Sequence, residues 1–206
     1  MIEALAAYVL AHQRLPCPAT NTSGDAAAIC TVAGSNIGFI PFRSLGISEK
    51  LAKDGHHHWI TYAIQPSLAS ARLIYLQPPG LAVDPKTIFC ATTADGPLAI
   101  HNAQGESAVG APDFAAIALI AHGPSGGYYL DNCATQAVNS EDVHKINNAA
   151  RSGIFVTKPP QPSDANVFDD TILFISRNNL MAQKAKYPCR RRDWTAQLFQ
   201  SIANPI

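Results

Sequence analysis

The chain has 206 residues, which suits one domain or a domain with an appendage. Charged residues make up only 15% of the chain, and its 15 basic and 15 acidic side chains cancel to a formal net charge of zero. A balance this neutral excludes the basic face that nucleic acid or an anionic membrane surface would require. The sequence also contains no run of about 18 apolar residues, so we expect no membrane span within these residues.

The five cysteines, together with the low charge and the Asn-, Thr- and Ser-rich loops, favour an oxidising compartment. Because five is odd, at most two disulfide bonds form within the chain and one thiol remains. We expect Cys17 to pair with Cys30 across a short polar loop and Cys90 to pair with Cys133. Cys189 is then the candidate for the remaining thiol. The alternative is a set of five reduced, buried cysteines.

The first residues predict a short amphipathic helix that ends near Arg14. An apolar stripe recurs along one face at three- and four-residue spacing, formed by Ile2, Leu5, Val9 and Leu10. Pro16 prevents the helix from continuing. Because a helix of about a dozen residues is marginal alone in water, we expect it to lie against the rest of the domain.

Beyond this helix, residues 15–37 predict an irregular loop, and residues 38–47 predict an apolar segment that covers the core without joining a sheet, since Pro41 interrupts it. The run 114–122 is almost wholly apolar and is expected to be a central strand. Asp95-Gly96 is the best hairpin signal. The full set of expected strands, chosen for β-branched and aromatic content, is 59–64, 72–77, 87–92, 97–101, 114–122 and 171–176.

Further helices are expected over residues 140–151, capped by Asn139 or Ser140, and over residues 178–185. Asp193 is expected to cap an amphipathic helix over residues 194–203. Residues 157–164 predict a proline-rich loop. Together these elements predict an α+β fold in which a leading helix packs on an antiparallel β-sheet with long, disulfide-braced loops.

The order of several motifs resembles the soluble domain of type IV pilin-like proteins, including the pseudopilins of type II secretion. Each motif alone is weak, and the likeness rests on their order from residue 2 to about residue 185. They are Arg14-Leu15-Pro16-Cys17-Pro18 after the helix, Gly38-Phe39-Ile40-Pro41-Phe42, Asp54 followed by Trp59 and Tyr62-Ala63-Ile64, the strand 117–122 with Gly123, and Phe168-Asp169-Asp170.

The resemblance implies that residues 1–185 form a pilin-like globular domain and that residues 186–206 form a C-terminal tail with a short helix. Residues 1–14 would be the second half of a long helix. In that family the first half, which this sequence lacks, is a membrane span that is processed by a prepilin peptidase and methylated. Residue 1 is therefore expected to be an artificial start.

The implied function is that of a non-enzymatic minor pilin or pseudopilin in a type IV pilus or a type II secretion filament. Its partners would be other pilin subunits and, through the missing half-helix, the inner membrane. The protein would be extracytoplasmic, facing the periplasm or assembled in a cell-surface filament. The helix would pack in the filament through its apolar stripe, Ile2, Leu5, Val9 and Leu10.

Two other functions are consistent with the sequence. The first is a secreted or tip-located adhesin that holds a ligand in loops 80–112 and 157–168. The second is a serine hydrolase, because Gly123-x-Ser125-x-Gly127 matches the nucleophile-elbow pattern and follows a strand. That mechanism also needs a helix directly after Ser125 and a later histidine, for which His144 is the one candidate. A tight glycine- and proline-rich turn explains the same residues without chemistry.

Two groups of residues suggest metal ligands, although no cofactor is otherwise expected. His56 and His58 could share a transition metal, but solvated loop histidines are the favoured interpretation. Most pilin-like relatives carry a Trp-Gly pair where this chain has these histidines, so no metal role transfers from the family. Asp164, Asp169 and Asp170 could supply oxygen ligands to calcium, whereas turn and strand-start capping is the simpler interpretation.

Overall fold

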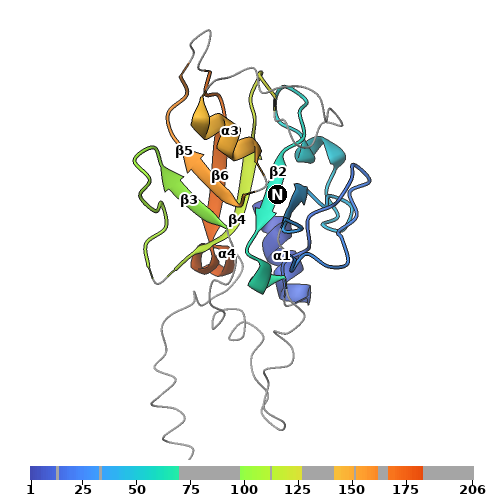
Figure 1. The fold of residues 1–206 in the computed structure, drawn as a ribbon. Coiled ribbons are helices and arrows are strands. Elements are labelled where there is room, and N and C mark those ends of the chain that lie inside the picture. The colour runs from blue at the N-terminus through green and yellow to red at the C-terminus, as the bar shows by residue number, and fades with distance from the viewer. Residues whose placement is uncertain are drawn as a thin grey trace, which may run out of the picture.

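A computed structural model describes residues 1–12, 14–32, 34–69, 98–111, 113–126, 142–150, 152–161 and 167–182. Helices and strands are mixed in this part of the chain, as expected for an α+β fold (Figure 1). None of the helices in these ranges is both long enough and apolar enough to cross a membrane. The predicted elements at 72–77, 87–92 and 194–203, the Asp95-Gly96 turn and Cys189 lie outside the described residues.

The centre of the molecule is a four-stranded antiparallel sheet in the order β1-β2-β4-β6. Its strands are β1 (Ile37–Phe39), β2 (Thr61–Ile64), β4 (Ala115–Ala121) and β6 (Thr171–Ser176). The prediction that the apolar run 114–122 forms a central strand is confirmed, since β4 pairs with β2 on one side and β6 on the other. The prediction that residues 38–47 stay outside the sheet is wrong. Gly38 and Phe39 pair with β2, and Pro41 lies beyond the end of β1, where it removes no ladder hydrogen bond.

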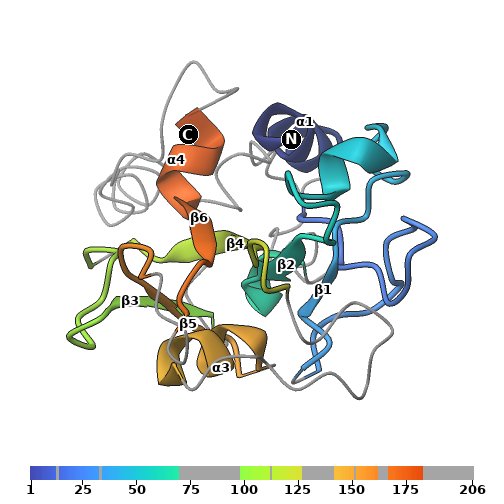
Figure 2. The same ribbon diagram turned by 90° about the horizontal axis from the view of Figure 1, so that it is seen from above.

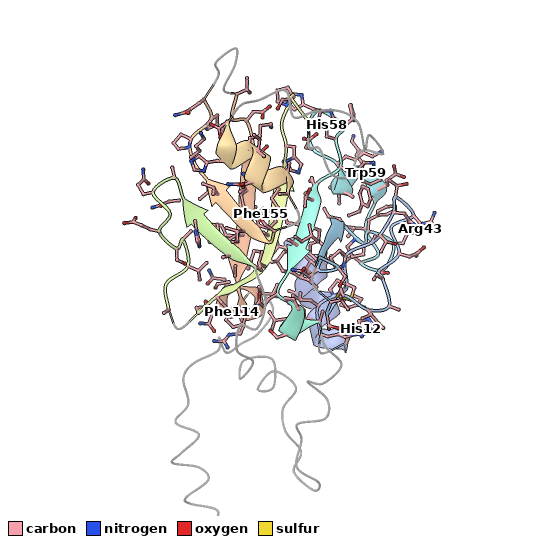
Figure 3. All side chains as sticks on the ribbon, viewed as in Figure 1. His12, Arg43, His58, Trp59, Phe114 and Phe155 are labelled. Carbon is pink, nitrogen blue, oxygen red and sulfur yellow. A yellow bond between two sulfur atoms is a disulfide. The ribbon has the colours of Figure 1, made fainter. Side chains whose placement is uncertain are left out.

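A second, smaller layer consists of β3 (Ala99–Asn102) and β5 (Ile154–Thr157), which pair in parallel. The sequence did not predict β5, and it predicted antiparallel pairing throughout. Phe155 on β5 is fully buried against the larger sheet, in a cluster that includes Ala118 and Ile120 of β4 (Figure 3). Figure 2 shows this layer and α3 (Val143–Ala149) on one face of the larger sheet.

The opposite face of the larger sheet is covered by α1 (Ile2–His12) and by α4 (Arg177–Ala182), which directly follows β6 (Figure 2). Leu5 and Val9 of α1 are buried in the cluster that contains Tyr62 and Ile117 of the sheet. Ile2 is half-buried against the same cluster. The apolar stripe therefore packs within its own chain, as expected for a helix too short to be stable alone. The side chain of Leu10 is not described.

The segment that leaves α1 is fixed to the sheet by polar and covalent links. The Tyr62 hydroxyl donates a hydrogen bond to the Pro16 carbonyl at 3.2 Å, and the backbones of Ala19 and Phe39 exchange two hydrogen bonds at 2.9 Å. Burial, with a smaller contribution from Tyr8, raises the pKa of Tyr62 well above its ordinary value, so its hydroxyl remains a donor.

Cys17 and Cys30 are joined by a disulfide bond, the pairing that their spacing favoured. The bond closes the loop that follows α1. The other predicted pair, Cys90 with Cys133, lies outside the described residues.

Replacing Cys17 with serine should lower the free energy of unfolding by about 3 kcal/mol under oxidising conditions, because the open loop gains entropy in the unfolded chain. Under reducing conditions, wild type and variant should be equally stable. Chemical denaturation with and without a reductant measures both differences, and Cys30→Ser is the matched variant that should behave identically. A stability loss that persists under reduction would mean that serine itself, rather than the missing bond, causes it.

Candidate functional site

A concentrated group of charged and polar side chains lies where the end of β4, the start of β6 and α3 meet. We call His122, Lys145, Asp169 and Asp170 the Lys145 cluster. Lys145 is 1% exposed, His122 2% and Asp170 4%. The Lys145 ammonium donates to Asp170 Oδ1 at 2.9 Å, to the His122 carbonyl at 3.0 Å and to Asp169. The buried ammonium thus links α3 to the end of β4 and to the start of β6.

Thr61 and Ser125 connect the cluster to its surroundings. His122 Nε2 lies 2.8 Å from the Thr61 hydroxyl of β2, and its Nδ1 lies 3.4 Å from Asp170 Oδ1. Ser125 donates to the Asp169 carboxylate from its backbone N–H at 2.9 Å and from its hydroxyl at 2.7 Å. The turn after β4 is therefore attached to the strand that follows it in the sheet.

Gly123 permits this attachment. Its φ is +66°, which glycine adopts without strain, and a Cβ at this position would lie 2.7 Å from the Asp169 carboxyl. Any other residue would push Asp169 away from Ser125 and Lys145. This close contact explains why position 123 is a glycine, and no catalytic role for the turn is needed.

The protonation state of Asp169 follows from two opposed effects. Burial, the largest single effect, would raise its pKa, but the hydrogen bonds from Lys145 and Ser125 together outweigh burial and lower the pKa below its ordinary value. The carboxylate is therefore ionised at neutral pH. In this form the carboxylate accepts hydrogen bonds and donates none.

The calcium hypothesis is only partly consistent with this geometry. Asp169 and Asp170 do lie together, but the Lys145 ammonium occupies the position between them that a cation would take. Within the described ranges, no group of three or more metal-type side chains is suited to hold an ion. Asp164 lies outside those ranges. Because Lys145 already neutralises the paired aspartates, we propose no calcium site. No pattern in the polar helix 140–151 indicated that one of its lysines would be buried here.

The histidine run forms a tight turn that Asp54 organises. Asp54 Oδ1 accepts hydrogen bonds from the backbone N–H groups of His56 and His58, both at 2.9 Å, and His57 has a φ of +66°. His58 Nδ1 lies 2.9 Å from the Gly123 carbonyl, which can only accept, so Nδ1 carries the proton. His58 lies at the same end of the molecule as α3 (Figure 3). The run therefore attaches a loop to the end of β4.

Ser125 does not have the geometry of an activated nucleophile. Its hydroxyl donates to the ionised carboxylate of Asp169, not to a histidine. An elbow serine sits on a strained turn, whereas His57 is the only non-glycine residue with a positive φ in the ranges that the structure covers. Residues 127–141, where the required helix would begin, are not described.

A second buried ion pair fixes the start of α3. Asp142, and not the predicted Asn139 or Ser140, caps this helix, with Oδ1 accepting from the N–H groups of His144 at 2.9 Å and Lys145 at 3.1 Å. Its Oδ2 contacts the Lys158 ammonium. Burial, the largest effect, would raise the pKa of Asp142, but these hydrogen bonds and the charge of Lys158 lower it overall.

Further along α3, the side-chain amide of Asn148 exchanges hydrogen bonds with the backbone of Val156 on β5, at 2.7 and 3.0 Å. The helix is thus held mainly by polar contacts. Apolar periodicity, which is the usual signal for a packed helix, could not have revealed them.

Comparison with known proteins adds no relative. No family model, characterised protein or solved structure matches this chain.

Replacing Lys145 with methionine should lower the free energy of unfolding by about 3–5 kcal/mol, because it leaves two buried carboxylates without their counter-charge. Guanidinium denaturation at neutral pH measures the loss. Lys50→Met is the control, since Lys50 is exposed and its loss should cost within about 0.5 kcal/mol. Equal stability of the two variants would show that the Lys145 cluster does not stabilise the fold.

Asp142 predicts a specific pH dependence. Because its folded-state pKa lies below its unfolded-state pKa, its contribution to stability is complete above the unfolded-state value and is lost as the pH falls from about 5 towards the folded-state value. Asp142→Asn keeps a good helix cap but removes the titration, so the variant should lose less stability than wild type over this window. Urea denaturation at a series of pH values tests this, with the exposed Asp25→Asn as control. Parallel pH profiles for wild type and Asp142→Asn would contradict it.

Proposed function

We propose that this chain is the globular domain of a non-enzymatic, pilin-like filament subunit, a minor pilin or a pseudopilin. The observation that carries the proposal is the packing of α1. The helix lies on one face of a four-stranded antiparallel sheet, and a disulfide bond and the Tyr62–Pro16 hydrogen bond fix its exit. A helix held in this way can transmit force between a preceding segment and the domain.

The face of α1 that would contact other subunits differs from the one expected from sequence. Leu5 and Val9 are buried in their own domain and are not accessible to a neighbour. The exposed residues of the helix include Ala7 and Ala11, which lie one turn apart. Small side chains allow two helices to approach closely, so we propose that this alanine face packs against neighbouring helices in the filament.

Two further observations support a structural role. The Cys17–Cys30 bond is consistent with folding outside the cytoplasm, where disulfide bonds persist. The sites that suggested chemistry, Ser125 and the paired aspartates, are engaged in internal hydrogen bonds and ion pairs.

The mature N-terminus of the native protein, isolated from its own cells and analysed by mass spectrometry, tests the proposal. We expect a methylated first residue that opens an apolar segment of about 20 residues ahead of Ile2, long enough to cross a bilayer. The scar of an ordinary signal peptide close to residue 1 would overturn the filament proposal and would favour a secreted binding module instead.

The contact face is tested separately in the full-length protein within its cells. A photo-reactive amino acid at Ala11 should cross-link two copies of the protein, or one copy to another pilin subunit. The matched control is the same amino acid at Gln104, which is also exposed but lies after β3 on the far layer. Equal yields at the two positions would mean that α1 is not the contact face.

A further inference from the structure

Two polar atoms of the Lys145 cluster lack the partners that burial demands. His122 Nδ1 and Asp170 Oδ2 are both inaccessible to solvent, and neither has a hydrogen-bond partner in the part of the chain that the structure describes. Buried polar groups are nearly always satisfied, since each one left alone destabilises the fold. Two such atoms within one small cluster therefore require an explanation.

The same cluster brings an amine and a carboxyl group into contact. Lys145 Nζ lies 2.9 Å from Asp170 Oδ1, and these side chains are 2% and 0% exposed. A buried ion pair gains little net stability, because both charges have lost their hydration. Condensation to an amide would remove both charges, and holding the two groups together in a dry site favours it.

We propose that Lys145 and Asp170 form an intramolecular isopeptide bond. Lys145 Nζ attacks Asp170 Cγ, a new Nζ–Cγ bond forms, and one Cγ–Oδ bond breaks. The ammonium and carboxylate together become one amide and one molecule of water. No oxidant, reductant or other reactant is consumed.

The surroundings match the amide better than they match the ion pair. The amide N–H has an acceptor in place, because the His122 carbonyl already lies 3.0 Å from Lys145 Nζ. The amide carbonyl oxygen has a donor in His122 Nδ1, which lies 3.4 Å from Asp170 Oδ1 while Nε2 bonds the Thr61 hydroxyl. The unsatisfied Oδ2 of Asp170 is the oxygen that departs as water. The reaction thus accounts for both unpaired atoms.

Asp169 is positioned to move the protons. Its carboxylate also contacts Lys145 Nζ, and Ser125 orients it through two hydrogen bonds. The ammonium gives up two protons as the amide forms, and Asp169 accepts each in turn from the nitrogen and passes it to the departing oxygen, which leaves as water. Ser125 acts as a positioning residue in this scheme.

The bond would tie α3 covalently to the start of β6, closing a loop between residues separated by 25 positions. This is the same kind of constraint that the Cys17–Cys30 bond applies on the other side of the chain, but it resists reduction. The inference does not depend on the proposed filament function.

Mass spectrometry of the purified wild-type protein tests the proposal directly. After reduction of all disulfides, the intact mass should be lower than the sequence mass by one water molecule. A protease digest should contain one branched peptide that joins Lys145 to Asp170. An intact mass equal to the sequence mass would overturn the proposal. Loss of water without a branched peptide would also overturn it, since a cyclised aspartate loses water too.

Variants then test the role of each residue. Lys145→Arg cannot form the bond, so the intact mass of this variant should equal its sequence mass. Asp170→Asn should react by releasing ammonia in place of water, so its product should have the same mass as cross-linked wild type. Asp169→Asn removes the proton carrier and should slow cross-linking by about 100-fold or more, seen as uncross-linked protein.

Lys158 provides the matched control, because it pairs with Asp142 and contacts no second carboxylate in the described residues. Lys158→Arg should leave the loss of water unchanged. A branched peptide that ends at Asp169 instead of Asp170 would contradict the assigned acceptor. Should Lys145→Arg fail to fold, the wild-type and Asp170→Asn masses still decide the question.

Discussion

One half of this molecule depends on the contacts that the buried Lys145 side chain makes. Asp169 and Asp170 directly precede β6, and both carboxylates contact the ammonium of Lys145 at the buried end of β4. Without a cation between them their charges would repel in a region of low dielectric. Lys145 supplies that cation from α3 and also bonds the His122 carbonyl. The position of α3 and the start of β6 are therefore determined together.

The other half of the molecule is held by different forces. Beneath α1 the contacts are apolar, with Leu5 and Val9 packed on the sheet, and a disulfide bond closes the loop that follows. Beneath α3 they are ion pairs and hydrogen bonds, which are directional, from Asp142, Lys145 and Asn148. Apolar packing tolerates small shifts, whereas a buried ion pair requires its geometry to be kept.

Local sequence signals were reliable where one physical effect dominated. The apolar run at 114–122 predicted a buried strand, the stripe in residues 2–10 predicted a packed helix, and both formed. The prediction for residues 38–47 was wrong because Pro41 was treated as interrupting the segment, although the three-residue strand ends before it. The strand β5 was missed because its four residues pair in parallel with β3, more than 50 positions earlier, and no local pattern encodes that contact.

The sequence by itself determined the α+β composition, the central position of β4, the buried stripe of α1 and the pairing of Cys17 with Cys30, because each depends on near neighbours and on the hydrophobic effect. Tertiary structure alone decided the candidate site. Ser125, Asp169 and Asp170 attracted attention as a nucleophile and as calcium ligands, yet their chemistry is set by a lysine from a distant, polar helix. The charge that two carboxylates meet depends on which side chain folding buries between them, and spacing along the chain carries no information about it.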